Sequence, residues 1–161
     1  MDSLCRILVP TDFSPSSEGA LDYAWYLARR VGGAIDLLHV EDPPADRAGG
    51  PSELLSFADT ASGVAMHRAL AERQRFGGVE IRGRVEIGEA CETIVRVAAT
   101  RHFQLVVMGQ PSIAPPGHDC IARRVAHSVR CPVIKVRAAL EDGTRLVNAS
   151  GAFRRPEFRA A

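Results

Sequence analysis

Five short segments carry the apolar positions typical of β-strands. They span residues 6–10, 34–41, 79–88, 104–109 and 131–137. The first, RILVP, is continuously apolar, which is typical of a strand buried on both faces of a parallel sheet. Within the third run, Gly83 interrupts the apolar positions and is a possible β-bulge. We predict that each run forms a strand.

Between these runs the apolar residues follow a helical period. In the first helix the stripe is Leu21, Ala24, Trp25 and Ala28, with Ser14 as N-cap, Pro15 in the first turn, and Gly32 and Gly33 at the end. A second helix is predicted over residues 52–76, a third over 88–102 and a fourth over about 119–130. In the second helix the buried face is predicted to be Leu54, Phe57, Ala58, Ala61, Val64 and Ala65.

Strands and helices therefore alternate as βαβαβαβαβ. This order favours an α/β fold in which helices cover both faces of a parallel sheet. Residues 138–161 lie outside the pattern and are interpreted as a C-terminal tail, so the predicted domain is 1–137.

Composition narrows the function classes. The 161 residues are 46% apolar and 24% charged, with a formal net charge of +1. This balance is ordinary for one globular domain and disfavours a nucleic-acid or membrane surface. The sequence has no apolar run long enough to span a membrane and no signal-peptide pattern, so we expect a cytoplasmic protein. Four cysteines without a CxxC pair are expected to be reduced thiols, with Cys5 and Cys91 filling apolar positions.

Four short motifs together resemble the universal stress protein family. They are PTDFS at 10–14, LLHV at 37–40, VMG at 107–109 and CPV at 131–133, and the resemblance covers roughly residues 4–137. It implies a Rossmann-like sheet of strand order 3-2-1-4-5. It also implies a homodimer formed through the last strand, at Pro132, Val133, Ile134, Lys135 and Val136. In the family, Pro10, Thr11 and Asp12 would contact a nucleoside, and the backbone of Val40 would meet adenine.

The glycine motif of ATP-binding members is degenerate in this chain. After the fourth strand they carry Gly, two residues, Gly, nine residues, Gly, then Ser or Thr. Gly109, after Met108, matches the first glycine, but Ser112, Asp119 and Cys120 occupy the other three positions, and six residues stand where nine are expected.

These departures predict weak or absent ATP binding and no resident cofactor. Pro111, Pro115 and Pro116 remove N–H donors from the loop. Asp119 is predicted to be the N-cap of the fourth helix, where its carboxylate would occupy the place of a phosphate and repel a triphosphate. A thiol replaces the hydroxyl donor.

Several residues keep a second interpretation. Asp12 is also a common turn residue, and Pro10 and Thr11 can be strand-exit residues. His118, Cys120, His127 and Cys131 are close in sequence, and His127 and Cys131 could share a helix face, but accidental spacings of this kind are frequent and no metal site is predicted. His39 is interpreted as a core or strand-edge histidine, and His67 and His102 as helix surface residues.

The leading hypothesis is a non-catalytic, cytoplasmic stress-response dimer that acts through a protein partner. No nucleophile, base and acid stand at a recognisable spacing, so we do not expect an enzyme. One alternative is an ATP-binding switch with an altered phosphate loop. A second is a thiol redox protein using Cys120, in the first turn of the fourth helix.

Overall fold

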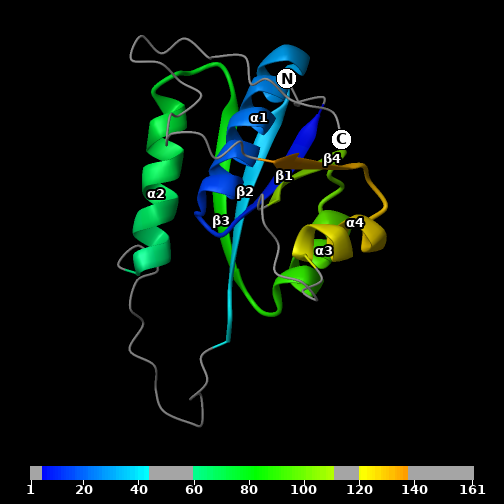
Figure 1. The fold of residues 1–161 in the computed structure, drawn as a ribbon. Coiled ribbons are helices and arrows are strands. Elements are labelled where there is room, and N and C mark those ends of the chain that lie inside the picture. The colour runs from blue at the N-terminus through cyan, green and yellow to red at the C-terminus, as the bar shows by residue number, and fades with distance from the viewer. Residues whose placement is uncertain (1–4, 44–59, 111–119, 138–161) are drawn as a thin grey trace.

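The computed structural model describes residues 5–43, 60–110 and 120–137. Its strands are β1 (Arg6–Thr11), β2 (Ala34–Glu41), β3 (Glu80–Ile87), β4 (Leu105–Gln110) and β5 (Val133–Arg137). Its helices are α1 (Pro15–Val31), α2 (Ala61–Gln74), α3 (Ala90–Thr100) and α4 (Ile121–Ser128). The strands form one parallel sheet in the order β3-β2-β1-β4-β5, which confirms the predicted fold class and strand order (Figure 1).

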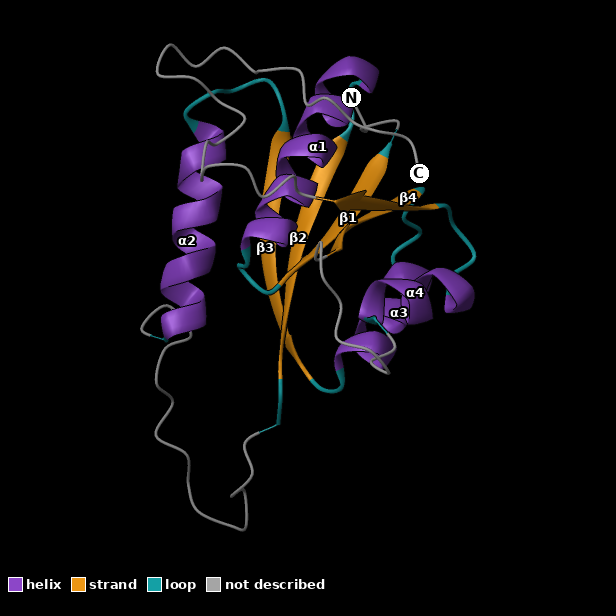
Figure 2. Ribbon diagram, viewed as in Figure 1, coloured by secondary structure: helices purple, strands orange, loops and turns teal. Residues whose placement is uncertain are grey.

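Helices cover both faces of the sheet and create two apolar cores (Figure 2). In the first core, α1 and α2 pack on one face, with Leu21 and Trp25 against Ile7 and Val9. In the second, α3 and α4 pack on the other face, with Ile94 and Val125 among its members. Strand β1 contributes buried side chains to both cores, which explains why its sequence is continuously apolar.

Helix α1 matches the sequence prediction closely. Ser14 is its N-cap, with extended backbone and a side chain that accepts the Ser17 N–H, and Pro15 follows in the first turn. The four residues of the predicted stripe are all buried. Gly32 ends the helix in the left-handed conformation at φ 70°, which glycine adopts at little cost.

The prediction for α2 was wrong in both start and face. Thr60 has extended backbone and caps a helix that begins at Ala61, so no continuous helix spans 52–76; residues 52–59, with Leu54, Phe57 and Ala58, lie outside the described part of the chain. Val64 is 59% exposed. The buried residues of α2 are instead Gly63, Met66, Ala69 and Arg73.

Gly83 is not a bulge, because β3 pairs with β2 in unbroken register from Glu80 to Ile87. A Cβ at Gly83 would lie 2.8 Å from the Leu70 Cδ1 and the Met66 Sδ. The glycine therefore allows α2 to lie close against the strand.

The last two helices are shorter than predicted. Helix α3 ends at Thr100, so exposed His102 lies beyond it, with φ 54°, rather than on the helix surface. Helix α4 ends at Ser128, so His127 and Cys131 do not share a helix face. Among the described residues, no helix has the length and apolar character needed to cross a membrane.

Candidate functional site

The carboxyl ends of β1 and β4 lie where the strand order reverses, which is the usual ligand position in an open α/β sheet. We call this place the switch point and define it as Pro10, Thr11, Asp12, Met108 and Gly109. The two strands pair only at Ile7 with Leu105 and Leu8 with Val106. Beyond Leu8 the ladder between them stops.

Pro10 explains where the ladder stops. The carbonyl of Arg6 accepts the Gln104 N–H at 3.1 Å, so Arg6 faces β4. Alternate residues of a strand direct their backbone groups to the same neighbour. The nitrogen of Pro10 therefore faces β4, and it has no hydrogen to donate. A proline in this central strand ends pairing at the switch point.

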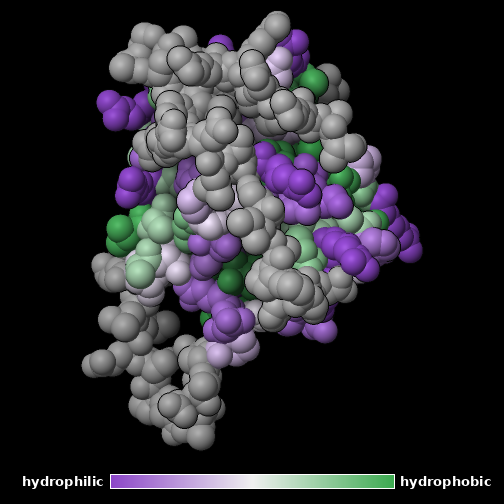
Figure 3. All heavy atoms as spheres, viewed as in Figure 1, coloured by the Kyte–Doolittle hydropathy of each residue, from purple (hydrophilic) through white to green (hydrophobic). Residues whose placement is uncertain are grey.

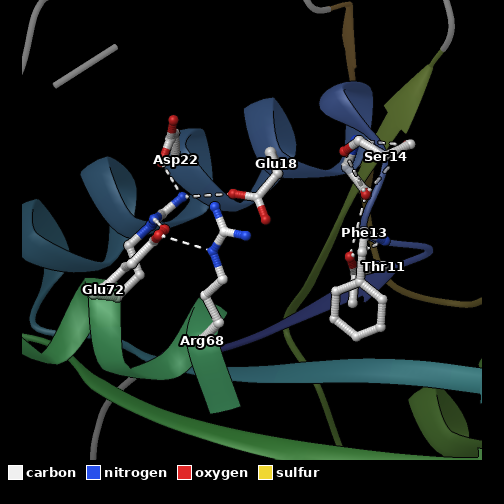
Figure 4. A network of polar contacts seen from close by, with 9 residues as sticks. Thr11, Phe13, Ser14, Glu18, Asp22, Arg68 and Glu72 are labelled. Carbon is white, nitrogen blue, oxygen red and sulfur yellow. Dashed lines mark hydrogen bonds and ion pairs between the residues drawn. The ribbon is translucent and has the colours of Figure 1, made fainter. Parts of the chain in front are cut away.

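Polar groups at the switch point bind the segment that leads into α1, and Figure 4 shows Thr11 beside Phe13 and Ser14. The Oδ1 of Asp12 accepts the Ser14 N–H at 3.0 Å and the Ser17 hydroxyl at 2.8 Å. Thr11 Oγ1 donates to Ser17 Oγ at 3.1 Å and accepts the Phe13 N–H at 2.9 Å. Asp12 therefore makes the contacts of a turn residue, which is its second interpretation in the sequence.

The hydrogen bonds also favour the charged form of Asp12. Partial burial of the carboxylate would raise its pKa, but hydrogen bonds from Ser14 and Ser17 outweigh it and hold the pKa of Asp12 below its ordinary value. The carboxylate thus stabilises the entry to α1 and adds negative charge to the site.

Gly109 lies directly against α1. A Cβ there would overlap the carbonyl group of Ser16 and lie 2.7 Å from the Ser17 nitrogen. Since these are backbone atoms, the first turn of the helix leaves no space for a side chain. The first glycine of the motif thus has a packing reason of its own.

Two apolar side chains, one half-buried and one buried, form the adenine side of the predicted site. Val40 packs against the second core, and Met108 is buried there. Next to Val40, the His39 Nδ1 lies 2.8 Å from the Thr11 carbonyl oxygen, and its ring lies 4.7 Å from that of Phe13.

Sequence reasoning missed Phe13, Ser17 and His39 as members of this cluster. Three serines occur in SPSS, shortly after the first strand, and this group of hydroxyl side chains was a signal for Ser17. The contact between Phe13 and His39 joins two strand ends and had no local signal.

The remaining motif positions are only partly described. Ser112 and Asp119 lie outside the described residues. Cys120 itself holds the N-cap position of α4, which corrects both the assignment of Asp119 as N-cap and the placement of Cys120 in the first turn. Its side chain makes no cap hydrogen bond and packs at the edge of the second core.

The cysteines and histidines show no metal cluster within the described parts of the chain. Cys5, Cys91, Cys120 and Cys131 are all free thiols. Burial raises the pKa of Cys91 and of Cys131, which disfavours their reactive thiolate forms. The redox alternative at Cys120 stays a prediction.

Comparisons with known proteins agree on one family. The model of the Universal stress protein family matches residues 5–137. A solved structure from that family in Burkholderia pseudomallei is 25% identical, with a TM-score of 0.64, and the match covers 84% of this chain and 98% of that one. A comparison with curated protein sequences gave no match.

Two further solved structures share the fold and contain adenine nucleotides. A universal stress protein family protein from Arabidopsis thaliana, with AMP bound, is 14% identical, with a TM-score of 0.61 and coverage of 83% of this chain and 91% of that one. The universal stress protein from Archaeoglobus fulgidus in complex with dAMP is 20% identical, with a TM-score of 0.57 and coverage of 83% and 98%.

Proposed function

Because this chain belongs to the universal stress protein family, we propose that it is a non-catalytic, cytoplasmic dimer that acts by contact with another protein. Adenine nucleotides bind it weakly or not at all. The observation that carries the proposal of weak nucleotide binding is that Thr11 and Asp12 of the switch point both bond to the Ser17 hydroxyl of α1.

A triphosphate has few free partners here. The hydroxyl of Ser17 and the carboxylate of Asp12 already bond to each other, and the carboxylate is anionic. A ligand must break these bonds before it forms its own, which reduces the net gain in affinity. In the loop after β4, the missing glycines and the aspartate at 119 remove further phosphate contacts.

The nucleoside side is better preserved. Pro10, Thr11, Asp12 and Val40 match the family positions in sequence, and relatives of the same fold hold AMP and dAMP. We therefore propose that any residual affinity resides in adenosine contacts. The ATP-switch alternative requires the opposite, a large contribution from the phosphates.

The nucleotide content of freshly purified protein tests this proposal. The protein would be denatured, and the released nucleotide identified by chromatography and quantified against the chain. We expect far less than one nucleotide per chain. Stoichiometric ATP would contradict the proposal and favour the ATP switch, and stoichiometric AMP would also contradict the proposal.

The two edges of the sheet differ in a way that supports dimerisation through β5. On β3 every second residue is charged: Glu80, Arg82, Arg84 and Glu86. Such a charged edge strand resists pairing with another chain. The β5 strand, VIKVR, exposes only Lys135 and Arg137, and its other side chains are buried or half-buried. A second copy of β5 would cover the half-buried Val133 and Ile134.

A further inference from the structure

The C-terminal ends of α1 and α2 meet at one end of the molecule, in a basic patch that contains apolar residues. We call this patch the basic end, and its members are Arg29, Arg30, Val31, Arg75 and Phe76. The ring of Phe76 lies 6.1 Å from that of Trp25 in α1, so the two helix ends are in contact. Val31 is 51% exposed and Phe76 is 39% exposed.

The positive charge of the basic end has no compensation nearby. In the described parts of the chain, none of its three arginines forms an ion pair, and Glu72 and Glu80 pair with other arginines. Aromatic rings hold two of the three instead. The guanidinium carbon of Arg29 lies 4.8 Å from the centre of the Trp25 ring, and that of Arg30 lies 4.9 Å from the centre of the Tyr26 ring. A stacked guanidinium keeps the N–H donors at its edge for a carboxylate from outside.

An acidic patch lies at the carboxyl ends of β2 and β3. We call it the acidic end, and its members are Glu41, Asp42 and Ile87. Glu41 pairs with Ile87 in the strand register, and its carbonyl accepts the Gly88 N–H at 2.9 Å. Ile87 is 54% exposed. Among the described residues, neither carboxylate of this patch has an ion-pair partner.

The two patches also share an apolar component. Of the five large apolar side chains that are exposed in the described residues, three belong to these patches. Among the coloured residues on the face shown in Figure 3, apolar residues form small groups between hydrophilic ones. Each patch therefore combines a small apolar surface with charges of one sign.

The patches lie at opposite ends of the same side of the sheet (Figure 1). Strand β2 begins at Ala34, just after the basic end, and reaches Glu41 eight residues later, which is about 26 Å of extended chain. Ile87 lies on the face that α1 and α2 cover, because Val85, two residues earlier, packs against the first core. The two patches of one copy are thus too far apart to meet each other.

We propose that the basic end binds the acidic end of a second copy of this chain, so that copies associate head to tail. The carboxylates of one copy meet the arginines of the next, and Ile87 packs against Val31 and Phe76. The charges are complementary, and the apolar side chains of both patches lose contact with water. Because the contact joins two different patches, each copy keeps one free end and the assembly is open.

This contact goes beyond the proposed function and does not rest on the dimer, since neither patch includes a residue of β5. Pairs between exposed charges contribute little, and the apolar area is small, so the contact is weak. We expect head-to-tail association to become measurable only above about 100 μM. At micromolar concentration the contact is unpopulated.

Sedimentation of the full chain from about 5 to 500 μM tests the proposal, at about 20 mM and about 500 mM salt. In low salt, the mean mass should rise with concentration beyond its value at 5 μM. High salt should suppress this rise, because it screens the charges of both patches.

A mixing experiment identifies the two patches. Arg29→Glu removes a charge from the basic end and leaves the acidic end intact, and Glu41→Arg does the reverse. Each variant alone should show at least about tenfold weaker association than the parent. An equimolar mixture should have a greater mean mass than either variant alone, because the intact acidic end of one meets the intact basic end of the other.

The matched control is Arg101→Glu. Arg101 is also an exposed arginine at a helix end, but it follows α3 on the other face of the sheet. This variant should associate as the parent does. Arg29→Gln and Glu41→Gln give smaller losses in the same direction, and they replace the charge reversals if those variants fail to fold.

Three outcomes would overturn the proposal: a parent mass that does not rise with concentration in low salt, equal losses for Arg29→Glu and Arg101→Glu, or a mixture no heavier than its components. The nucleotide measurement is independent of all three. A protein purified with stoichiometric ATP that still associates head to tail would contradict the proposed function and leave this contact in place.

Discussion

Gly109 has no room for a side chain, because the backbone of Ser16 and Ser17 lies against its Cα. Backbone atoms at a helix start cannot yield as the end of a flexible side chain can. We expect Gly109→Ala to lower the free energy of unfolding by about 1–3 kcal/mol, the usual range for overpacking. Urea denaturation measures the change.

Gly83→Ala is the matched control for this substitution. Its new Cβ would meet only the side-chain ends of Leu70 and Met66, which can shift. We expect a smaller loss of stability than for Gly109→Ala. A larger loss at Gly83 would contradict the packing argument for Gly109.

Asp12 should make a small, acid-sensitive contribution to stability. Its folded pKa lies below the ordinary value of 3.8, so the unfolded state binds the proton more readily. The contribution is complete above the unfolded pKa and is lost as pH falls through the folded pKa. Asp12→Asn should therefore destabilise the protein at neutral pH and flatten its stability profile below about pH 4.

Thermal unfolding from pH 7 to pH 3 measures this difference, with exposed Asp42→Asn as the control. Parallel profiles for the parent and Asp12→Asn would show that the bonds from Ser14 and Ser17 do not favour the charged carboxylate.

Single residues at the switch point show what a sequence can predict. The cap at Ser14 and the glycine at 109 were recognisable because each has a local signature. Pro10 ends the pairing of β1 with β4 because its nitrogen faces β4 and has no hydrogen to donate. The sequence around Pro10 does not show this, since the strand that the nitrogen faces depends on the strand order of the sheet. The contact of Phe13 with His39 depends on the pairing of β1 with β2, so the local sequence does not predict it.

Helices α1 and α2 are joined by a buried arginine. Arg73 is 6% exposed and pairs with Asp22, which is 7% exposed, and at 3.2 Å with Glu18. Removal of one partner from a buried pair leaves the other charge without compensation. We expect Arg73→Met to lower the free energy of unfolding by about 3 kcal/mol.

Arg68→Met provides the comparison within the same helix. Arg68 pairs with Glu72 at 3.4 Å, but its side chain is 74% exposed. Its loss should cost at most about 0.5 kcal/mol by urea denaturation. Equal costs for the two variants would show that burial does not decide the contribution of Arg73.

This arginine also explains why the buried face of α2 was wrongly predicted. A hydrophobic pattern assigns Val64 to the interior and Arg73 to the surface, whereas the structure has the opposite arrangement. Besides the neighbouring Glu72, the carboxylates that compensate the buried Arg73 are those of Glu18 and Asp22 of α1, and Asp22 lies 51 residues earlier in the chain. Helix α1 was predictable because its buried stripe is purely apolar.

For the whole molecule, we predict a dimer through β5. Sedimentation at micromolar concentration should give about twice the 17.4 kDa mass of the chain. Ile134→Glu, which places a charge on the half-buried part of β5, should shift the protein toward monomer. A parent protein that sediments as a monomer would exclude this assembly.

We propose a degenerate phosphate site beside a preserved nucleoside side. Titration calorimetry with ATP and magnesium distinguishes the two sides, with adenosine as the second ligand and Asp119→Gly as the variant. We predict an ATP dissociation constant above about 100 μM, tighter binding in Asp119→Gly, and an affinity for adenosine no weaker than that for ATP. Micromolar ATP binding that Asp119→Gly leaves unchanged would show that the phosphates lie elsewhere and that this loop is not a degenerate phosphate site.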